Sequence, residues 1–160
     1  MNLTTLLFSF QGRINRARYW WVVLINLALF TVCLVFALAL IGLEISNATP
    51  WTAAPVNYLF MAIFAVVGLL MIWSSTAAGI KRLHDRDQSG WWMLVFWGVG
   101  AIVDLLQETA TTSSSKFILG VGSLAVTVWV IVELGCLRGT VGPNRFGDDP
   151  LPSHKEATLA

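Results

Sequence analysis

The charged stretch KRLHDRDQSGWW, residues 81–92, decides the fold because it separates two long apolar segments. It holds three basic residues, two acidic residues and one histidine, whereas the whole chain of 160 residues is 56% hydrophobic and only 12% charged. A soluble domain of this size cannot bury so much apolar surface. The composition therefore predicts helices that cross a lipid bilayer, with residues 81–92 as a polar connection at the membrane surface.

Four apolar segments predict four membrane-spanning helices. The first has about 24 residues, which at about 1.5 Å each reach about 36 Å and cross the hydrocarbon with some tilt. The third is the shortest, and Asp104 lies near its far end. We therefore predict an all-α integral membrane four-helix bundle, a single domain over residues 1–150 with spans at about 20–43, 57–80, 91–108 and 117–138.

The connections and the two ends of the chain have other patterns. Residues 2–10 place apolar side chains at i, i+3, i+4 and i+7, which predicts a short N-terminal helix lying in the membrane interface. A frayed terminus is the alternative interpretation. Residues 44–56 contain two prolines and predict a loop, and residues 151–160 predict a disordered tail.

The basic residues are distributed unevenly and so predict the orientation. With four spans, nine of the ten Lys and Arg residues fall on one side of the membrane and only Lys116 falls on the other. Basic residues collect on the cytoplasmic side, so we predict that the N-terminus and the C-terminus are both cytoplasmic.

The basic residues on this side are candidates for binding anionic lipid headgroups, namely Arg13, Arg16, Lys81, Arg82 and Arg145. The expected partners are therefore membrane lipids, mainly those with anionic headgroups. Pairs of small residues, Ser74 with Ala78 and Ser75 with Gly79, also allow close helix packing in a homo-oligomer or with another membrane protein. Nucleic acid is not expected as a partner, because the basic residues form no extended face.

His84, Asp85 and Asp149 are candidates for an ion-paired cap or for acid/base chemistry. Lys81 and Asp85 have the i, i+4 spacing of a helical ion pair, and Asp85 is also expected to pair with an arginine. No second histidine or cysteine completes a metal set near His84, so no metal and no cofactor is expected. The sequence favours the structural interpretation and leaves the catalytic one as an alternative.

Glu133 is a carboxylate about one turn inside the cytoplasmic end of the last predicted span. Such a group is costly in lipid and must be paired or protonated. One interpretation is an anchor for Arg16, Arg82 or Arg138. The other is a proton or cation relay that also uses Asp104.

Three motifs, in order, carry a family resemblance. The first motif is FQGRINR at residues 10–16, followed by Tyr19-Trp20. The second, within residues 81–92, is KRLHD at residues 81–85 with SGWW at residues 89–92. The third, within residues 139–150, is Gly139-Thr140 with residues 142–150, which contain Asn144-Arg145-Phe146-Gly147 and Asp149-Pro150. Together they resemble the bacterial inner-membrane family catalogued as domain of unknown function 805. The resemblance implies a small multi-pass helical protein of the bacterial inner (plasma) membrane, and it suggests that the three motifs form one unit.

The leading functional prediction is a non-catalytic membrane interaction or lipid-associated accessory protein with an ion-paired cytoplasmic cap. One alternative is a transporter or channel component that uses Glu133 and Asp104. Another is a membrane-embedded enzyme that acts on a lipid-linked substrate with His84 and Asp85.

Overall fold

The computed structural model of the chain describes residues 2–47 and 55–151, and the secondary-structure elements of these residues are all helices, as predicted. The short helix α1 (Leu3–Phe8) precedes four long helices, α2 (Arg16–Asn47), α3 (Pro55–Asp85), α4 (Trp92–Thr109) and α5 (Ser113–Ile131). The chain continues from α5 into one turn of π-helix, η2 (Val132–Cys136). Residues 48–54 and 152–160, which include part of the predicted loop and nearly all of the predicted tail, lie outside the described residues.

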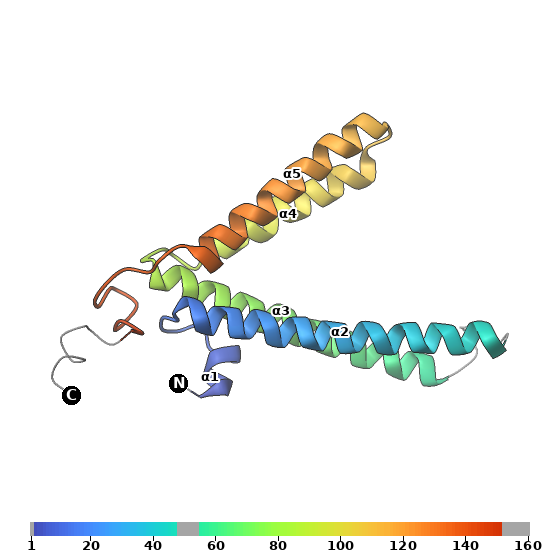
Figure 1. Ribbon diagram of the computed structural model, residues 1–160, viewed down its shortest axis with the longest axis horizontal. Coiled ribbons are helices and arrows are strands. Elements are labelled where there is room, and N and C mark those ends of the chain that lie inside the picture. Colours follow the sequence, from blue (N-terminus) through green and yellow to red (C-terminus); the bar gives the residue numbers. More distant parts are fainter. Residues whose placement is uncertain (1, 48–54, 152–160) are drawn as a thin grey trace.

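The long helices form two hairpins, α2 with α3 and α4 with α5, which diverge like the arms of a V (Figure 1). The hairpins meet at one end, which we call the closed end, where α1 and the segment after η2 also lie. The four predicted helices are therefore present, but they splay as two pairs, whereas the sequence predicted one bundle. Apolar arms have no strong drive to associate with one another in lipid, so only the closed end fixes their arrangement.

Within the described residues, three helical stretches are long and apolar enough to cross a membrane, at Arg16–Gly42, Tyr58–Asp85 and Ser113–Cys136. The helix α4 has only 18 residues and carries Asp104 and Glu108 toward its C-terminal end. Large apolar side chains along both arms are exposed, as in Leu69 on α3 and Leu124 on α5. The arms thus present apolar surface outward, which is the pattern that lipid requires.

Local signals set the helix ends. The side chain of Asn15 accepts a hydrogen bond of 2.9 Å from the backbone N–H of Arg18 and so caps the start of α2. At the end of α3, Asp87 adopts a positive φ of 57°, and the N–H of Gln88 reaches back to the carbonyl of Leu83 at 2.9 Å. This is a Schellman ending, which turns the chain directly into the start of α4.

The buried residues gather at the closed end. One apolar cluster contains Leu83, Met93, Phe96 and Leu134, and joins α3, α4 and η2. A second contains Ile14, Val22 and Ala78. These clusters pack beside the charged residues of the three motifs, so the polar site is held by the best-packed part of the molecule.

Candidate functional site

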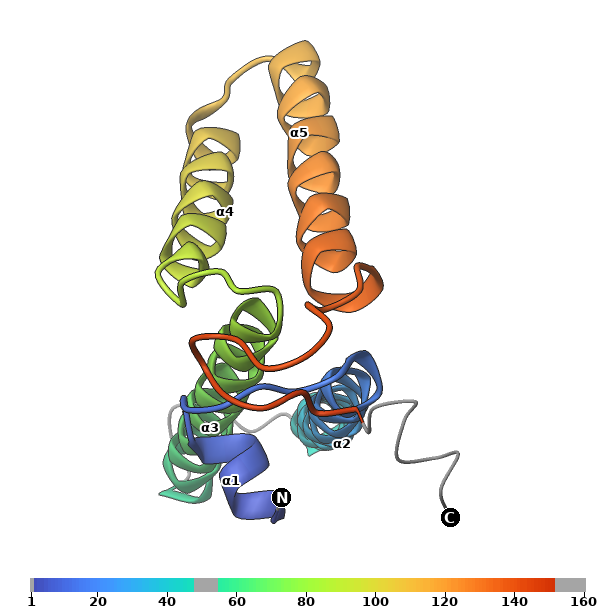
Figure 2. The same ribbon diagram turned by 90° about the vertical axis from the view of Figure 1, so that its left-hand side faces the viewer.

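The three sequence motifs meet at the closed end, as the sequence suggested. Figure 2 shows the segment after η2 crossing the ends of α2 and α3, beside the segment that joins α1 to α2. Arg13 comes from the first motif, Arg82 and Asp85 come from the second, and the third contributes mainly backbone carbonyls. We call this set of contacts the clamp.

Asp85 is the central residue of the clamp. Its Oδ1 accepts a hydrogen bond from Nε of Arg13 at 3.2 Å, and its Oδ2 accepts one from Nη1 of Arg82. The side chains of Arg13, Arg82 and Asp85 are 1%, 0% and 5% exposed. The predicted pairing of Asp85 with an arginine is thus confirmed, with two arginines in place of one. One carboxylate cannot neutralise two guanidinium groups, so the remaining positive charge needs other acceptors.

The third motif supplies acceptors to Arg13. Nη1 of Arg13 donates to the carbonyls of Gly142 at 2.7 Å and Gly147 at 3.2 Å, and Nη2 of Arg13 donates to the carbonyl of Thr140 at 2.7 Å. Both glycines have positive φ, of 81° and 133°, which side chains rarely tolerate. The backbone N–H of Thr140 then donates to the carbonyl of Asp85 at 2.8 Å, which closes the connection between the second and third motifs.

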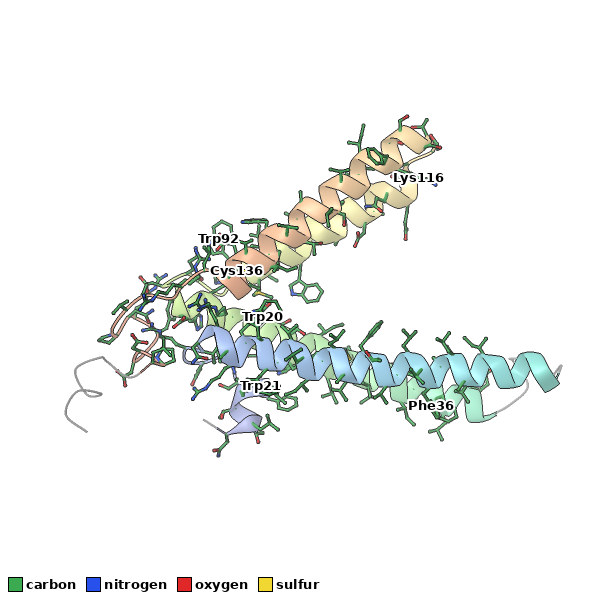
Figure 3. The ribbon with its side chains drawn as sticks, in the orientation of Figure 1. Trp20, Trp21, Phe36, Trp92, Lys116 and Cys136 are labelled. Carbon is green, nitrogen blue, oxygen red and sulfur yellow. The ribbon has the colours of Figure 1, made fainter. Side chains whose placement is uncertain are left out.

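The C-terminal end of α5 and η2 supplies acceptors to Arg82. Nε of Arg82 donates to the carbonyl of Leu134 at 2.8 Å, and Nη2 of Arg82 donates to the carbonyl of Leu137. Arg16 donates to the carbonyl of Cys136 at 3.1 Å, and the indole of Trp20 donates to that of Gly135 at 3.2 Å. Figure 3 shows Trp20 and Cys136 together at this end. Carbonyls at a helix C-terminus lack internal donors and carry partial negative charge, so basic residues of the other hairpin cap this end.

Gly139 permits the closest approach in the clamp. A Cβ atom at this position would lie 1.9 Å from Oδ2 of Asp85. A side chain here would displace the carboxylate from its arginines, so the conformation of the clamp requires glycine.

Lys81 is buried, but its partner differs from the prediction. Its Nζ donates to the carbonyls of Thr5 at 2.7 Å and Leu6 at 2.5 Å, instead of pairing with Asp85. Asp85 is already held by two arginines, whereas both carbonyls lie in the last turn of α1, where that of Thr5 also accepts a hydrogen bond from the N–H of Ser9 at 3.4 Å. Lys81 therefore caps α1 and docks it against α3.

Glu133 is also paired differently from the prediction. It forms an ion pair with Arg86, and not with Arg16, Arg82 or Arg138. Arg86 also donates to the backbone carbonyl of Glu133 at 3.2 Å. The anchor interpretation thus has a partner at the closed end. Asp104, the other carboxylate of the relay interpretation, lies on α4 and lines a cavity of about 510 Å³ with Tyr19 and Ser75.

His84 and Asp85 are neighbours in sequence whose side chains have separate partners. Nδ1 of His84 lies 3.3 Å from the carbonyl oxygen of Gly12, and its ring stacks on Phe146 with centroids 3.9 Å apart and planes at 5°. Because both Asp85 oxygens face arginines, the carboxylate does not orient the imidazole as an acid/base pair requires.

The remaining candidates lie at the edge of the clamp. Arg145 is exposed, with Nε 3.1 Å from Oδ1 of Asp87 and its guanidinium 4.7 Å from the Phe146 centroid. Asp149 accepts hydrogen bonds from the backbone N–H groups of Leu151 at 3.0 Å and Gly142 at 2.8 Å, which hold its pKa below the usual value. Asp149 thereby closes the turn that presents the glycine carbonyls to Arg13.

Of the five lipid candidates, Arg13, Lys81 and Arg82 point inward onto oxygen atoms of the chain itself. Only Arg16 and Arg145 are exposed.

The candidate site residues did not include Gly139 or Thr140, although both belong to the third motif. The pair Gly139-Thr140 at the start of the third motif was the sequence signal that could have identified them. That signal does not reveal that Gly139 lies against Asp85, because this contact depends on the fold.

Comparison with known proteins accounts for the three motifs. The family model described as "Protein of unknown function (DUF805)" matches residues 7–148, which include nearly all of them. The chain belongs to this family. Within it, the chain is 33% identical over 156 residues to "Uncharacterized protein YiiR" of Escherichia coli strain K12, with 93% of the chain and 90% of the relative covered.

Two further relatives from the same strain have names that state a location. They are "Inner membrane protein YhaH", 30% identical, and "Inner membrane protein YhaI", 31% identical. Each alignment covers 142 residues and 89% of the chain, with 87% of YhaH and 86% of YhaI. No solved structure matches the chain.

Proposed function

We propose that the chain is a non-catalytic, lipid-associated accessory protein of the bacterial inner membrane, in which the clamp holds two membrane hairpins together. The inner-membrane names of two relatives and the three membrane-capable helices support this location. The observation that carries the proposal is the inward orientation of Arg13, Arg82 and Asp85. The enzyme alternative requires Asp85 to face a substrate, whereas both of its oxygens accept hydrogen bonds from arginines of the chain itself.

The energetics of the clamp support a structural role. Removal of one member of a buried ion pair leaves an uncompensated charge and typically costs about 3–5 kcal/mol. Asp85 contacts both arginines, and these contact the backbone of the third motif and of η2, so the loss of its charge affects all of these contacts. Such a hub suits a device that fixes helices relative to one another.

We further infer that all four long helices stand in the bilayer with both termini cytoplasmic. In support, Lys116 lies at the far end of α5, whereas the arginines and lysine of the first two motifs lie at the closed end (Figure 3). The helix α4 returns beside α5, which has the length and hydropathy of a span.

Reporter fusions test this topology. A reporter inserted after Thr111, between α4 and α5, should behave as external, and one fused after Ala160 should behave as cytoplasmic. A second insertion near Ala53, outside the described residues, should also behave as external. A cytoplasmic response after Thr111 together with an external response near Ala53 would show that α4 does not cross the membrane.

Native mass spectrometry tests lipid association. The two exposed basic candidates, Arg16 and Arg145, lie near the closed end and supply the charge that anionic headgroups prefer. Wild-type protein should carry copurified lipid, and the double variant Arg16→Gln with Arg145→Gln should carry less anionic lipid. The matched control is Lys116→Gln at the far end. Wild-type protein free of lipid in a mild detergent would refute the association.

A further inference from the structure

A groove beside the clamp is not used by any contact described so far. It lies between the last turns of α3 and the start of α4, with a cavity volume of about 430 Å³. Ile80, Leu94 and Trp97 form apolar walls, whereas His84 and Ser89 contribute polar atoms at the end near the clamp. The groove is thus mainly apolar, with His84 and Ser89 at one end, and the hydroxyl of Thr76, which also lines it, donates to the carbonyl of Ile72 at 2.7 Å.

The hydrogen bond of His84 decides what its other nitrogen offers to the groove. The carbonyl of Gly12 only accepts, so the Nδ1 that faces it at 3.3 Å carries the proton. In the neutral ring, Nε2 is then an acceptor with a free lone pair. Among the described residues Nε2 has no hydrogen-bond partner, and it lies 3.5 Å from the place where a Cβ of Gly90 would stand. Gly90 itself lines the groove, and a Cβ there would lie 2.9 Å from Cγ2 of Ile80, so only glycine fits where the chain passes Ile80 and His84.

The lining of the groove offers an acceptor and an indole face to a cationic donor and no basic side chain to an anion, although the positive charge of Arg145 acts on His84 from outside the lining. No lysine or arginine is among the described residues that line it. Trp91 also lines the groove, and it is 75% exposed. An indole face attracts cations, and a neutral imidazole nitrogen accepts from an ammonium group. A phosphate group would find no basic partner on these walls.

A lipid molecule from the membrane is the occupant that we infer for the groove. The helix α3 is a candidate span up to Asp85, so on the proposed membrane placement the groove opens toward lipid. We propose that it binds one phosphatidylethanolamine molecule, whose ammonium donates a hydrogen bond to Nε2 of His84 and lies over the indole of Trp91. An acyl chain lies along Ile80, Leu94 and Trp97, and the phosphate stays hydrated at the water-facing side. This inference rests on the proposed lipid association and adds a site and a headgroup to it.

The test compares three headgroups with identical acyl chains. Delipidated full-length protein in detergent at pH 8, where the imidazole is neutral, is mixed with phosphatidylethanolamine, phosphatidylcholine and phosphatidylglycerol, and bound lipid is counted by native mass spectrometry. Phosphatidylcholine carries the same charge without an N–H donor, and phosphatidylglycerol carries no cation. Wild-type protein should prefer phosphatidylethanolamine over each of the others by about tenfold, the effect of one charge-assisted hydrogen bond.

Matched variants locate the site. His84→Asn keeps a donor where Nδ1 meets Gly12 but removes Nε2, so the preference over phosphatidylcholine should be lost. His84→Gln keeps an acceptor near the position of Nε2 and should retain part of that preference, and His154→Asn is the control histidine. Trp91→Leu should lower the preference over phosphatidylglycerol severalfold while keeping the preference over phosphatidylcholine.

The outcomes separate the two proposals. If wild-type protein binds none of the three lipids, the proposed lipid association is wrong. If it binds lipid but a folded His84→Asn protein has the wild-type headgroup ratios, the association stands and the His84 groove is not the site. If His84→Asn does not fold, Trp91→Leu decides, because an unchanged ratio of phosphatidylethanolamine to phosphatidylglycerol would overturn the inference.

Discussion

At the scale of single residues, Asp85 links the two halves of the clamp. It joins two arginines, and each arginine reaches a different segment of backbone, residues 140–147 for Arg13 and residues 134–137 for Arg82. Buried guanidinium groups need several acceptors with good geometry, and carbonyls at turns and helix ends provide them. The clamp therefore consists of charged side chains and backbone carbonyls, and each buried guanidinium group needs several of these acceptors together.

We predict that Asp85→Asn lowers the free energy of unfolding by about 3–5 kcal/mol, because it leaves two buried arginines without their carboxylate. The measurement is thermal unfolding in detergent, with Asp148→Asn as the control, since Asp148 is an exposed carboxylate of the third motif. Equal stabilities of the two variants would contradict the central role of Asp85.

We predict that Gly139→Ala destabilises the protein by several kcal/mol, because its Cβ would occupy the space of the Asp85 carboxylate. Gly122→Ala is the control, since a Cβ there meets no atom within 4 Å and alanine favours a helix. The same unfolding assay should separate the two variants. If Gly139→Ala is as stable as wild type, the backbone at this point is not fixed by the clamp.

The pKa of Asp149 predicts an acid-sensitive contribution to stability. The N–H groups of Leu151 and Gly142 lower the pKa of its carboxyl in the folded state, so the carboxylate stabilises the fold above the unfolded pKa of about 3.9. This contribution is lost as the pH falls through the folded pKa. Asp149→Asn should therefore be less stable than wild type at pH 7, and the difference should shrink below about pH 4. A difference that is independent of pH would refute this assignment.

At the scale of elements, the ends of α1 and η2 depend on basic side chains from other helices. Neither helix has a basic residue in its own last turn. Lys81 donates hydrogen bonds to carbonyls at the end of α1, and Arg82 and Arg16 donate to carbonyls at the end of η2. This arrangement ties each helix end to the hairpin that supplies the cation.

We predict that Lys81→Met releases α1 from α3, since methionine keeps much of the side-chain length but loses both hydrogen bonds to the α1 carbonyls. Hydrogen exchange of the amides of residues 3–8 should become faster by about tenfold or more, the effect of one charge-assisted hydrogen bond. Lys116→Met at the far end of α5 is the control and should leave this exchange unchanged. Unchanged exchange in Lys81→Met would show that the other contacts of α1, such as the bond from Trp73 to Phe8, are sufficient to hold it.

The sequence predicted the positions of the helices better than the hydrogen-bond and ion-pair partners of their charged side chains. Apolar length located all four long helices, and the spread of charge placed the three motifs at one end. The partner of Lys81 was missed because i, i+4 spacing describes contacts within one helix, whereas the carbonyls of Thr5 and Leu6 on α1 are 76 and 75 positions away. The partner of Glu133 was missed because the rotation of α3 relative to η2 decides between Arg82 and Arg86, and apolar sequence does not specify that rotation.

At the scale of the whole molecule, the divergence of the two hairpins was not predictable from the sequence. Hydropathy and connection length predict neighbouring antiparallel helices, and each hairpin agrees with that expectation. The angle between the hairpins follows from the clamp and from the apolar clusters at the closed end. These depend on long-range contacts among residues that are far apart in the chain.

The position of the clamp at one end has a mechanical consequence. Because the hairpins share a single joint, each behaves as a lever whose pivot lies at that joint. The 18 residues of α4 extend about 27 Å, so a rotation of about 10° at the pivot would move the distal tip by about 5 Å. Slight changes in the geometry around Asp85 would thus be amplified into a much larger displacement at the distal ends of the arms.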